Sequence, residues 1–187
     1  MCRSFLFVAF LLLVTSCATV RLAPEESAAL RTIEKYLQLD QSGARLDPNR
    51  HHSVAKLVQN PQTEEWTEFN VVSGWRIGRP MLSGTEVSAI VRYDLAGTMS
   101  GDVFTPLDSN MDNYDQLATV AYRLSLESGE WKLVDASALP FVSFSVARSW
   151  AKSLGAEAAL QELADAEYIA KLKSQRAGHC NCGRLDF

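Results

Sequence analysis

Three stretches of the chain alternate between apolar and polar residues with a period of two. They cover residues 69–77, 87–95 and 118–126. Because successive side chains of a strand point to opposite faces, each stretch predicts a long strand with one apolar and one mixed face. Such strands are typical of an antiparallel sheet that is covered on one side. Residues 127–130 then predict a hairpin turn that returns the chain into a strand over 131–134.

The apolar faces of these strands predict the main core. Its expected members lie at alternating positions of the strands and are Trp75, Val91, Tyr122, Leu124 and Leu133.

Helical patterns flank the strands on both sides. Pro24, Glu25 and Glu26 suit the start of a helix that we expect over residues 24–39, and a second, shorter helix is expected over 52–59. A further helix is expected to start near Phe144 and to end at Gly155. Residues 157–175 are rich in strong helix formers but carry a thin apolar stripe. This composition predicts a peripheral last helix that can be removed without unfolding the domain.

The order of these elements, together with the Gly-Glu-Trp-Lys-Leu-Val segment at 129–134, resembles the nuclear transport factor 2-like superfamily, which includes SnoaL-like proteins and ketosteroid isomerase. The resemblance implies a cone-shaped α+β fold over residues 24–137. In such a fold a strongly bent antiparallel sheet wraps round the N-terminal helices and leaves a pocket at its open end. The C-terminal helical extension, 138–176, goes beyond that pattern, and residues 177–187 are expected to form a flexible tail.

The N-terminus has the layout of a secretory signal. Arg3 precedes an uncharged apolar run over residues 5–14, which is shorter than the roughly 20 residues of a membrane span. The following Val14-Thr15-Ser16-Cys17 resembles a bacterial lipobox. The resemblance implies removal of a signal peptide, residues 1–16, and lipidation of Cys17, with 17–23 as a tether. We expect a lipid-anchored protein of the cell envelope, on the outer membrane and facing the periplasm; Ala18 favours the outer over the inner membrane only weakly.

Composition narrows the function classes. The chain has 187 residues, 47% of them apolar, and a formal net charge of −4. Its length favours one domain, and its acidic balance provides no basic footprint for nucleic acid. With nucleic acid excluded, the resemblances above imply two kinds of partner: the membrane, through Cys17, and a small apolar ligand or another envelope protein.

Two sets of strand residues are candidates for a binding site. Tyr93 and Tyr122, with Trp75, lie on apolar faces and line a ligand pocket if the cone is open; in the alternative they are core residues with satisfied hydroxyls. Arg92 and Arg123 lie on mixed faces and form an anion patch if their strands are neighbours. The alternative for these arginines is a solvated outer face.

Metal and cofactor sites are not predicted. Residues 108–113 begin like a calcium loop, but Asn113 replaces the expected glycine and Thr119 the expected glutamate. In the tail, His179, Cys180 and Cys182 are too few ligands for a closed zinc site, and the redox state of the two cysteines is open.

The sequence predicts a non-catalytic ligand-binding or assembly role. An isomerase, dehydratase or cyclase that uses the cone pocket is one alternative, although no catalytic position of the enzymatic relatives maps onto this chain. A structural lipoprotein of an envelope complex is the other. An enzyme requires an ionisable group with a perturbed pKa in an enclosed cavity, whereas an assembly protein requires a filled cone and an exposed apolar stripe on the last helix.

Overall fold

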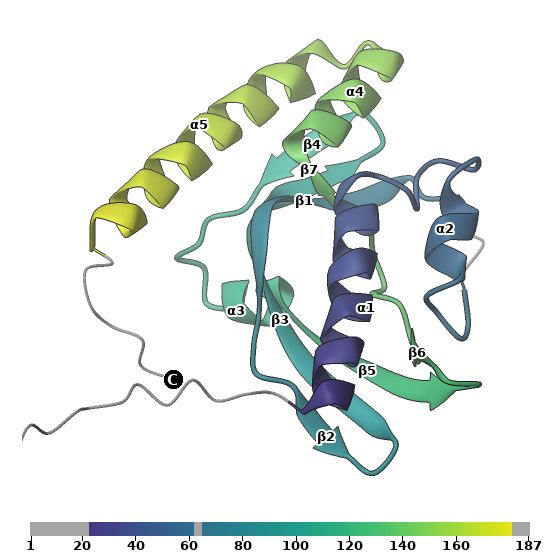
Figure 1. The fold of residues 1–187 in the computed structure, drawn as a ribbon. Helices are drawn as coiled ribbons and strands as arrows, with labels where there is room; N and C mark the ends of the chain where they lie inside the picture. The colour runs from purple at the N-terminus through teal and green to yellow at the C-terminus, as the bar shows by residue number, and fades with distance from the viewer. Residues whose placement is uncertain (1–22, 62–64, 181–187) are drawn as a thin grey trace, which may run out of the picture.

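The computed structural model describes residues 23–61 and 65–180 (Figure 1). Within them the chain forms an α+β fold with a strongly curled sheet. In chain order the elements are α1 (Pro24–Gln41), α2 (His51–Ala55), β1 (Glu68–Ile77), β2 (Met81–Ser83), β3 (Glu86–Ser100), β4 (Val103–Pro106), α3 (Tyr114–Ala118), β5 (Thr119–Glu127), β6 (Glu130–Leu133), β7 (Phe141–Ser143), α4 (Phe144–Leu154) and α5 (Glu157–Cys180).

The main path of the sheet runs β6-β5-β3-β1-β7, and β2 and β4 pair with β3. The three long strands and the β5–β6 hairpin confirm the period-two predictions. The sheet is mixed, however, because β7 runs parallel to β1. The expectation of a purely antiparallel sheet is thus wrong at this edge. With only three residues, β7 is too short to show alternation, and it also carries the sheet past the expected domain boundary at residue 137.

The helices begin and end where local chemistry dictates. Pro24 stands in the first turn of α1, and the Glu26 carboxylate accepts a hydrogen bond from the Ala23 N–H at 2.9 Å. Helix α4 ends at Gly155, whose φ of 67° is the left-handed conformation that glycine adopts without strain. Helix α2 is shorter than expected, and α5 continues past the expected end at residue 175.

Register shifts in the β1–β3 pair divide the apolar residues into two clusters. The shifts lie between Val71 and Val72 and between Val72 and Gly74. Before them, Phe69 and Val71 pack with α4 and α5, whereas Val72 packs with α1. Because side chains alternate between faces, an extra residue in a strand moves the following side chains to the other face. One strand therefore serves two cores.

The inner core lies between α1 and the sheet. Its buried members are Ala29, Ile33, Tyr36, Leu37, Ala44, Val54, Val58, Val72, Val87, Ala89, Val91, Tyr93, Leu95, Ala118, Tyr122, Leu124, Leu133 and Phe141. It contains four of the five predicted core residues. The fifth, Trp75, is half-buried at its edge.

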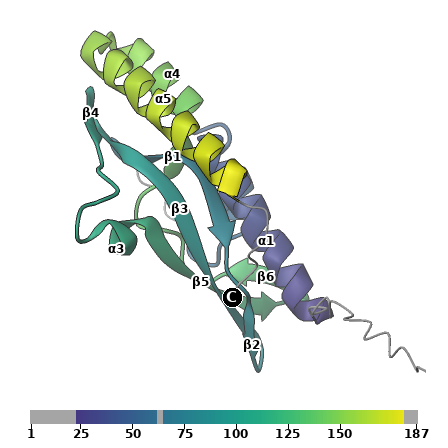
Figure 2. The ribbon, with the colours of Figure 1, turned by 90° about the vertical axis from the view of Figure 1, so that its left-hand side faces the viewer.

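The outer core lies between the sheet and the α4–α5 hairpin, which Figure 2 shows at the β4 end of the sheet. Its buried members are Phe69, Val71, Met99, Phe104, Val142, Phe144, Ala147, Ala151, Ala159 and Leu163. Helix α5 contributes Ala159 and Leu163, which are 2% and 0% exposed. The first half of α5 is therefore part of a core, and the sequence-based prediction of a wholly peripheral helix is too simple.

Candidate functional site

The predicted pocket tyrosines meet inside the inner core. The hydroxyl oxygens of Tyr93 and Tyr122 lie 2.7 Å apart, and the two residues are 2% and 1% exposed. The ring of Tyr93 stacks on Phe141 with centroids 3.8 Å apart, and Tyr122 meets Tyr36 edge to face. Burial raises the pKa of both hydroxyls well above the ordinary value. These tyrosines thus pack as core residues whose hydroxyls bond each other.

Trp75 lies apart from this pair, at the rim. Its indole N–H donates to the side-chain carbonyl of Gln41, at the end of α1, at 3.2 Å. Trp75 is the register partner of Tyr93 on the neighbouring strand. It therefore joins the end of α1 to the sheet.

A buried ion pair that the sequence analysis missed lies beside the tyrosines. Asp40 and Arg45 are 1% and 5% exposed, and the closest guanidinium nitrogen lies 3.8 Å from a carboxylate oxygen. The other carboxylate oxygen of Asp40 accepts the Phe141 N–H at 2.9 Å. Burial raises the pKa of Asp40 to about 6, and the charge of Arg45 opposes that rise.

Arg45 holds this network together through Ser137. Its guanidinium donates to the Ser137 hydroxyl at 3.0 Å, to the Ser137 carbonyl at 2.9 Å and to the Tyr36 hydroxyl at 3.3 Å. Burial raises the pKa of Tyr36 to about 12, which keeps that hydroxyl protonated and able to donate. The arginine therefore ties the loop after α1 to the segment before β7.

A sequence signal for Asp40 existed. The buried apolar positions of α1 are Ala29, Ile33, Tyr36 and Leu37, and the next position on the same face is Asp40. A carboxylate on the apolar face of a helix requires a partner, and Arg45 is the nearest arginine that follows.

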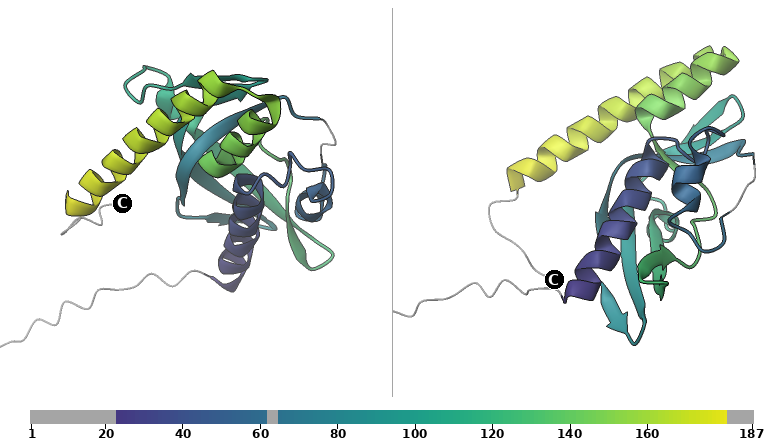
Figure 3. Two further views of the ribbon diagram at one scale, coloured as in Figure 1. Left: turned by 90° about the horizontal axis from the view of Figure 1, so that it is seen from above. Right: turned by 45° about the vertical axis from the view of Figure 1, so that its right-hand side comes forward.

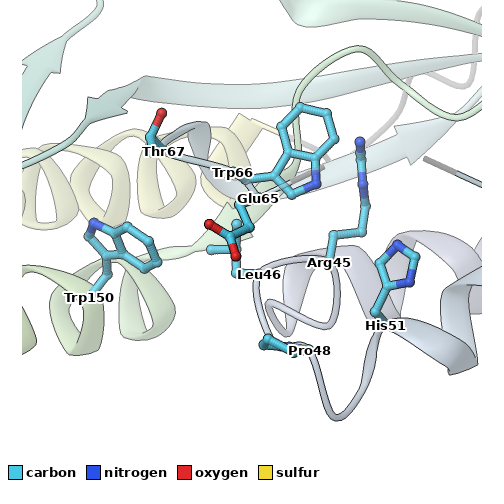
Figure 4. Close-up of a pocket in the computed structure, with 8 residues that line it drawn as sticks. All are labelled: Arg45, Leu46, Pro48, His51, Glu65, Trp66, Thr67 and Trp150. Atoms are coloured by element: carbon cyan, nitrogen blue, oxygen red, sulfur yellow. The ribbon is translucent and has the colours of Figure 1, made fainter. Parts of the chain in front are cut away.

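A pocket of about 470 Å³ opens on the far side of Arg45 (Figure 4). The guanidinium carbon of Arg45 lies 4.5 Å from the ring centre of Trp66, a cation–π arrangement. Trp150 lines the other side, and its indole N–H donates to the Gly101 carbonyl at 3.1 Å. Because Arg45 is almost wholly covered, the pocket presents the two indole rings and the exposed carboxylate of Glu65.

The predicted anion patch does not form. In the β3–β5 register Arg92 lies opposite Thr119, whereas Arg123 lies opposite Ser88. Four positions along a strand separate the two arginines by about 13 Å. Each arginine has its own carboxylate, Asp115 for Arg92 and Asp135 for Arg123. On the other side of β3, the register partner of Arg92 is Arg76 of β1.

A groove of about 730 Å³ runs between α5 and the face of the sheet that α1 does not cover. Ala96 and Ile169 contribute apolar surface, and Arg76 and Arg92 contribute charge. At one side Lys173 of α5 donates to the Ser109 hydroxyl at 2.9 Å. The Tyr114 hydroxyl also lines the groove, but it is bonded to the backbone of Leu95. This groove has the size and mixed lining of a binding site for a small molecule or a peptide.

The remaining candidates from the sequence are the calcium-like loop at 108–113 and the cysteines, and they form no site among the described residues. Asp108 lies in an exposed loop, where its carboxylate accepts the backbone N–H of Asn110 at 2.9 Å. Nowhere in the described ranges do three or more His, Cys, Asp or Glu side chains gather in a way that could hold a metal. Cys17 and Cys182 lie outside the described residues, and Cys180 is the last residue of α5.

Comparisons with protein-family models, with curated proteins and with solved structures returned no match. Among the helices of residues 23–61 and 65–180, none has the length and hydropathy needed to cross a membrane.

Proposed function

We propose that this chain is a lipid-anchored protein of the bacterial cell envelope whose domain serves assembly, with binding at its outer surface rather than catalysis in its interior. The observation that carries the proposal is the filled inner core. Tyr93 and Tyr122 bond each other where a catalytic or ligand-binding cone would be open. The large groove and the exposed apolar side chains of α5 lie on the other side of the sheet.

We also propose a nuclear transport factor 2-like ancestry for residues 24–137. The α1-first order, the curled sheet and the β5–β6 hairpin support it. The parallel β7 and the α4–α5 hairpin are additions to that pattern. They build the outer core and one wall of the groove, so the additions carry the surface on which the assembly role depends.

The enzymatic alternative has one observation in its favour, the raised pKa of Asp40. A general acid or base must reach its substrate within hydrogen-bond distance. Asp40 is 1% exposed, and one of its oxygens is bound to the Phe141 N–H. A structural carboxyl group explains the raised pKa without any catalytic role.

The membrane attachment depends on Cys17. Two or three acyl chains hold a protein firmly to a bilayer, whereas a single chain does so marginally. We place the anchor on the outer membrane, with the domain in the periplasm.

Mass spectrometry of the membrane-extracted protein tests the anchor. The expected result is acyl mass on a peptide that begins at Cys17, and release of the chain from the membrane fraction in Cys17→Ser. Thr15→Ser, which keeps a small residue in the lipobox, is the matched control and should remain acylated. A Cys17→Ser protein that is still acylated and membrane-bound would contradict the proposal.

A further inference from the structure

The C-terminal half of α5 exposes apolar side chains. Tyr168, Ile169 and Leu172 are 64%, 51% and 37% exposed, whereas Leu163 in the first half is fully buried. Figure 3 shows this half of the helix extending beyond α4. Exposed apolar side chains that gather on one helix face mark a surface for a partner.

Charged residues of opposite sign lie at equal distances on the two sides of Ile169. Asp165 precedes it by four residues and Lys173 follows it by four, and Glu162 precedes it by seven. Spacings of four and seven place side chains on one helix face. The face centred on Ile169 is therefore acidic toward the N-terminus of α5 and basic toward its C-terminus.

We infer that this face pairs with the same face of a second copy, with the two α5 helices antiparallel about a two-fold axis at Ile169. In that arrangement Asp165 of each copy lies beside Lys173 of the other, and the two Ile169 side chains meet on the axis. A parallel pair in register would place acid against acid, which disfavours it. A two-fold axis makes the contact closed, so it yields dimers and not filaments.

The charged groups of this face line the groove between α5 and the sheet, and a partner reaches them from the open side of that groove. In the described part of the chain, Glu162, Asp165 and Lys173 form no ion pair. The hydrogen bonds of Asp165 with Gln161 and of Lys173 with Ser109 are both exposed, so water can replace the intramolecular partner. Ala166 and Ala170 pack against the outer core of the same chain, so the contact with a second copy is made by Ile169 and the charged residues.

A contact between two half-helices is smaller than the roughly 1,200–2,000 Å² of a stable interface. We therefore expect a weak dimer in solution. Anchoring both copies in one membrane raises their effective concentration, which favours pairing without any new contact. This rise in effective concentration is the one part of the inference that rests on the proposed function, because it requires the membrane anchor. The helix contact itself requires no lipid.

Sedimentation of the purified full chain in a non-ionic detergent tests the contact. The wild type should form a reversible dimer. Asp165→Lys and Lys173→Asp should each weaken it about 10-fold or more, because each variant places like charges together twice. An equimolar mixture of the two variants should regain the dimer, since both charge pairs are then complementary. The double variant Asp165→Lys/Lys173→Asp should regain it as well.

Two controls sharpen the test. Glu34→Lys makes a change of the same size on the exposed side of α1 and should leave the dimer intact. Ile169→Asp places two carboxylates on the axis and should abolish pairing, while circular dichroism shows the helix content unchanged. A wild type that remains monomeric at roughly 100 µM would overturn the inference, as would single variants that dimerise normally or fail to complement each other.

The acyl mass at Cys17, measured on the same sample, separates this inference from the proposed function. An acylated chain that stays monomeric overturns the pairing alone. A dimer without acylation supports the pairing and overturns the anchor.

Discussion

The inner and outer cores differ in what they bury. The inner core encloses three tyrosines and lies against the Asp40–Arg45 pair, so it contains hydroxyl, carboxylate and guanidinium groups. The buried side chains of the outer core are all apolar, and three of the ten are alanines. Burying a polar group costs free energy unless the group forms a hydrogen bond, and a hydrogen bond requires a narrow range of distances and angles. Apolar contacts tolerate small displacements.

This difference assigns separate roles to the two regions. The hydrogen bonds of Tyr93, Tyr122 and Arg45 fix α1, the sheet and the segment before β7 in one arrangement. Helix α5 is held by few large side chains, of which Leu163 is the only fully buried one in its described length. The inner core is thus the framework, and the outer core is the attachment of a helix that carries a partner surface.

Arg45→Met should cause the largest loss. It leaves the Asp40 carboxylate buried without a compensating charge and removes three hydrogen bonds, so the free energy of unfolding should fall by about 3–5 kcal/mol. Chemical denaturation measures it. Arg50→Met is the matched control: Arg50 is exposed and donates to Ser42 at the surface, so a loss of less than about 1 kcal/mol is expected. Equal losses in both variants would remove the distinction between a framework and a surface arginine.

The second prediction concerns pH. The pKa of Asp40 rises from an ordinary 3.8 to about 6 in the folded protein, so the folded state binds the proton more tightly. Its contribution to stability is therefore fully present below pH 3.8 and is lost as the pH rises through about 6, a change of about 3 kcal/mol. The measurement is the difference in unfolding free energy between wild type and Asp40→Asn at several pH values from 3.5 to 8.

The other carboxylates are present in both proteins, so their contributions cancel when the unfolding free energy of Asp40→Asn is subtracted from that of the wild type. Relative to Asp40→Asn, the wild type should lose stability between pH 4 and 6 and change little above pH 7. A wild type that gains stability over this range relative to Asp40→Asn would mean that the charge of Arg45 outweighs burial.

Leu163→Ala tests the outer core. A fully buried leucine lost to alanine costs about 2–5 kcal/mol, and we expect a value near 2 because α5 can shift toward the sheet. The loss should be local: amide exchange in α5 should accelerate while α1 and β5 remain protected. Leu172→Ala, on the exposed half of the helix, is the control and should leave exchange unchanged. Loss of protection in α1 as well would mean that the two cores unfold as one unit.

Periodicity was sufficient for the long elements. Strands β1, β3 and β5 and helices α1 and α4 follow patterns over nine or more residues, and the Gly155 stop of α4 is local chemistry. The elements β2, β4, β7 and α3 have three to five residues each, which is too short for a pattern to appear. The three strands are placed by pairing with β1 or β3, and α3 by its contacts with β3 and β5, which is tertiary information.

The candidate site was harder to predict for the same reason. Tyr93 and Tyr122 were placed on apolar faces correctly, but whether a cone is open or filled depends on Phe141 and Tyr36, which arrive from distant parts of the chain. The proximity of Arg92 and Arg123 depends on strand register, which alternation alone does not fix. The groove depends on the packing of α5 across the sheet, and no residue of α5 signals it.

The smallest expected effect is also the most informative about α5. Ending the chain after Glu167 removes Tyr168, Ile169 and Leu172, which are exposed, but keeps Ala159 and Leu163 in the outer core and the ion pair between Arg148 and Glu167. The free energy of unfolding should change by less than about 0.5 kcal/mol, the range of surface substitutions. Ending the chain after Gly155 instead removes the buried leucine and should cost several times more. The longer variant also loses the contact of Ala170 with the outer core and two exposed polar contacts, of Lys171 with Glu167 and of Lys173 with Ser109. A single cooperative transition in thermal denaturation should nevertheless persist in it. A loss of stability equal to that of the shorter variant would show that the exposed half of α5 supports the outer core, and the partner surface would then have to be sought in the groove.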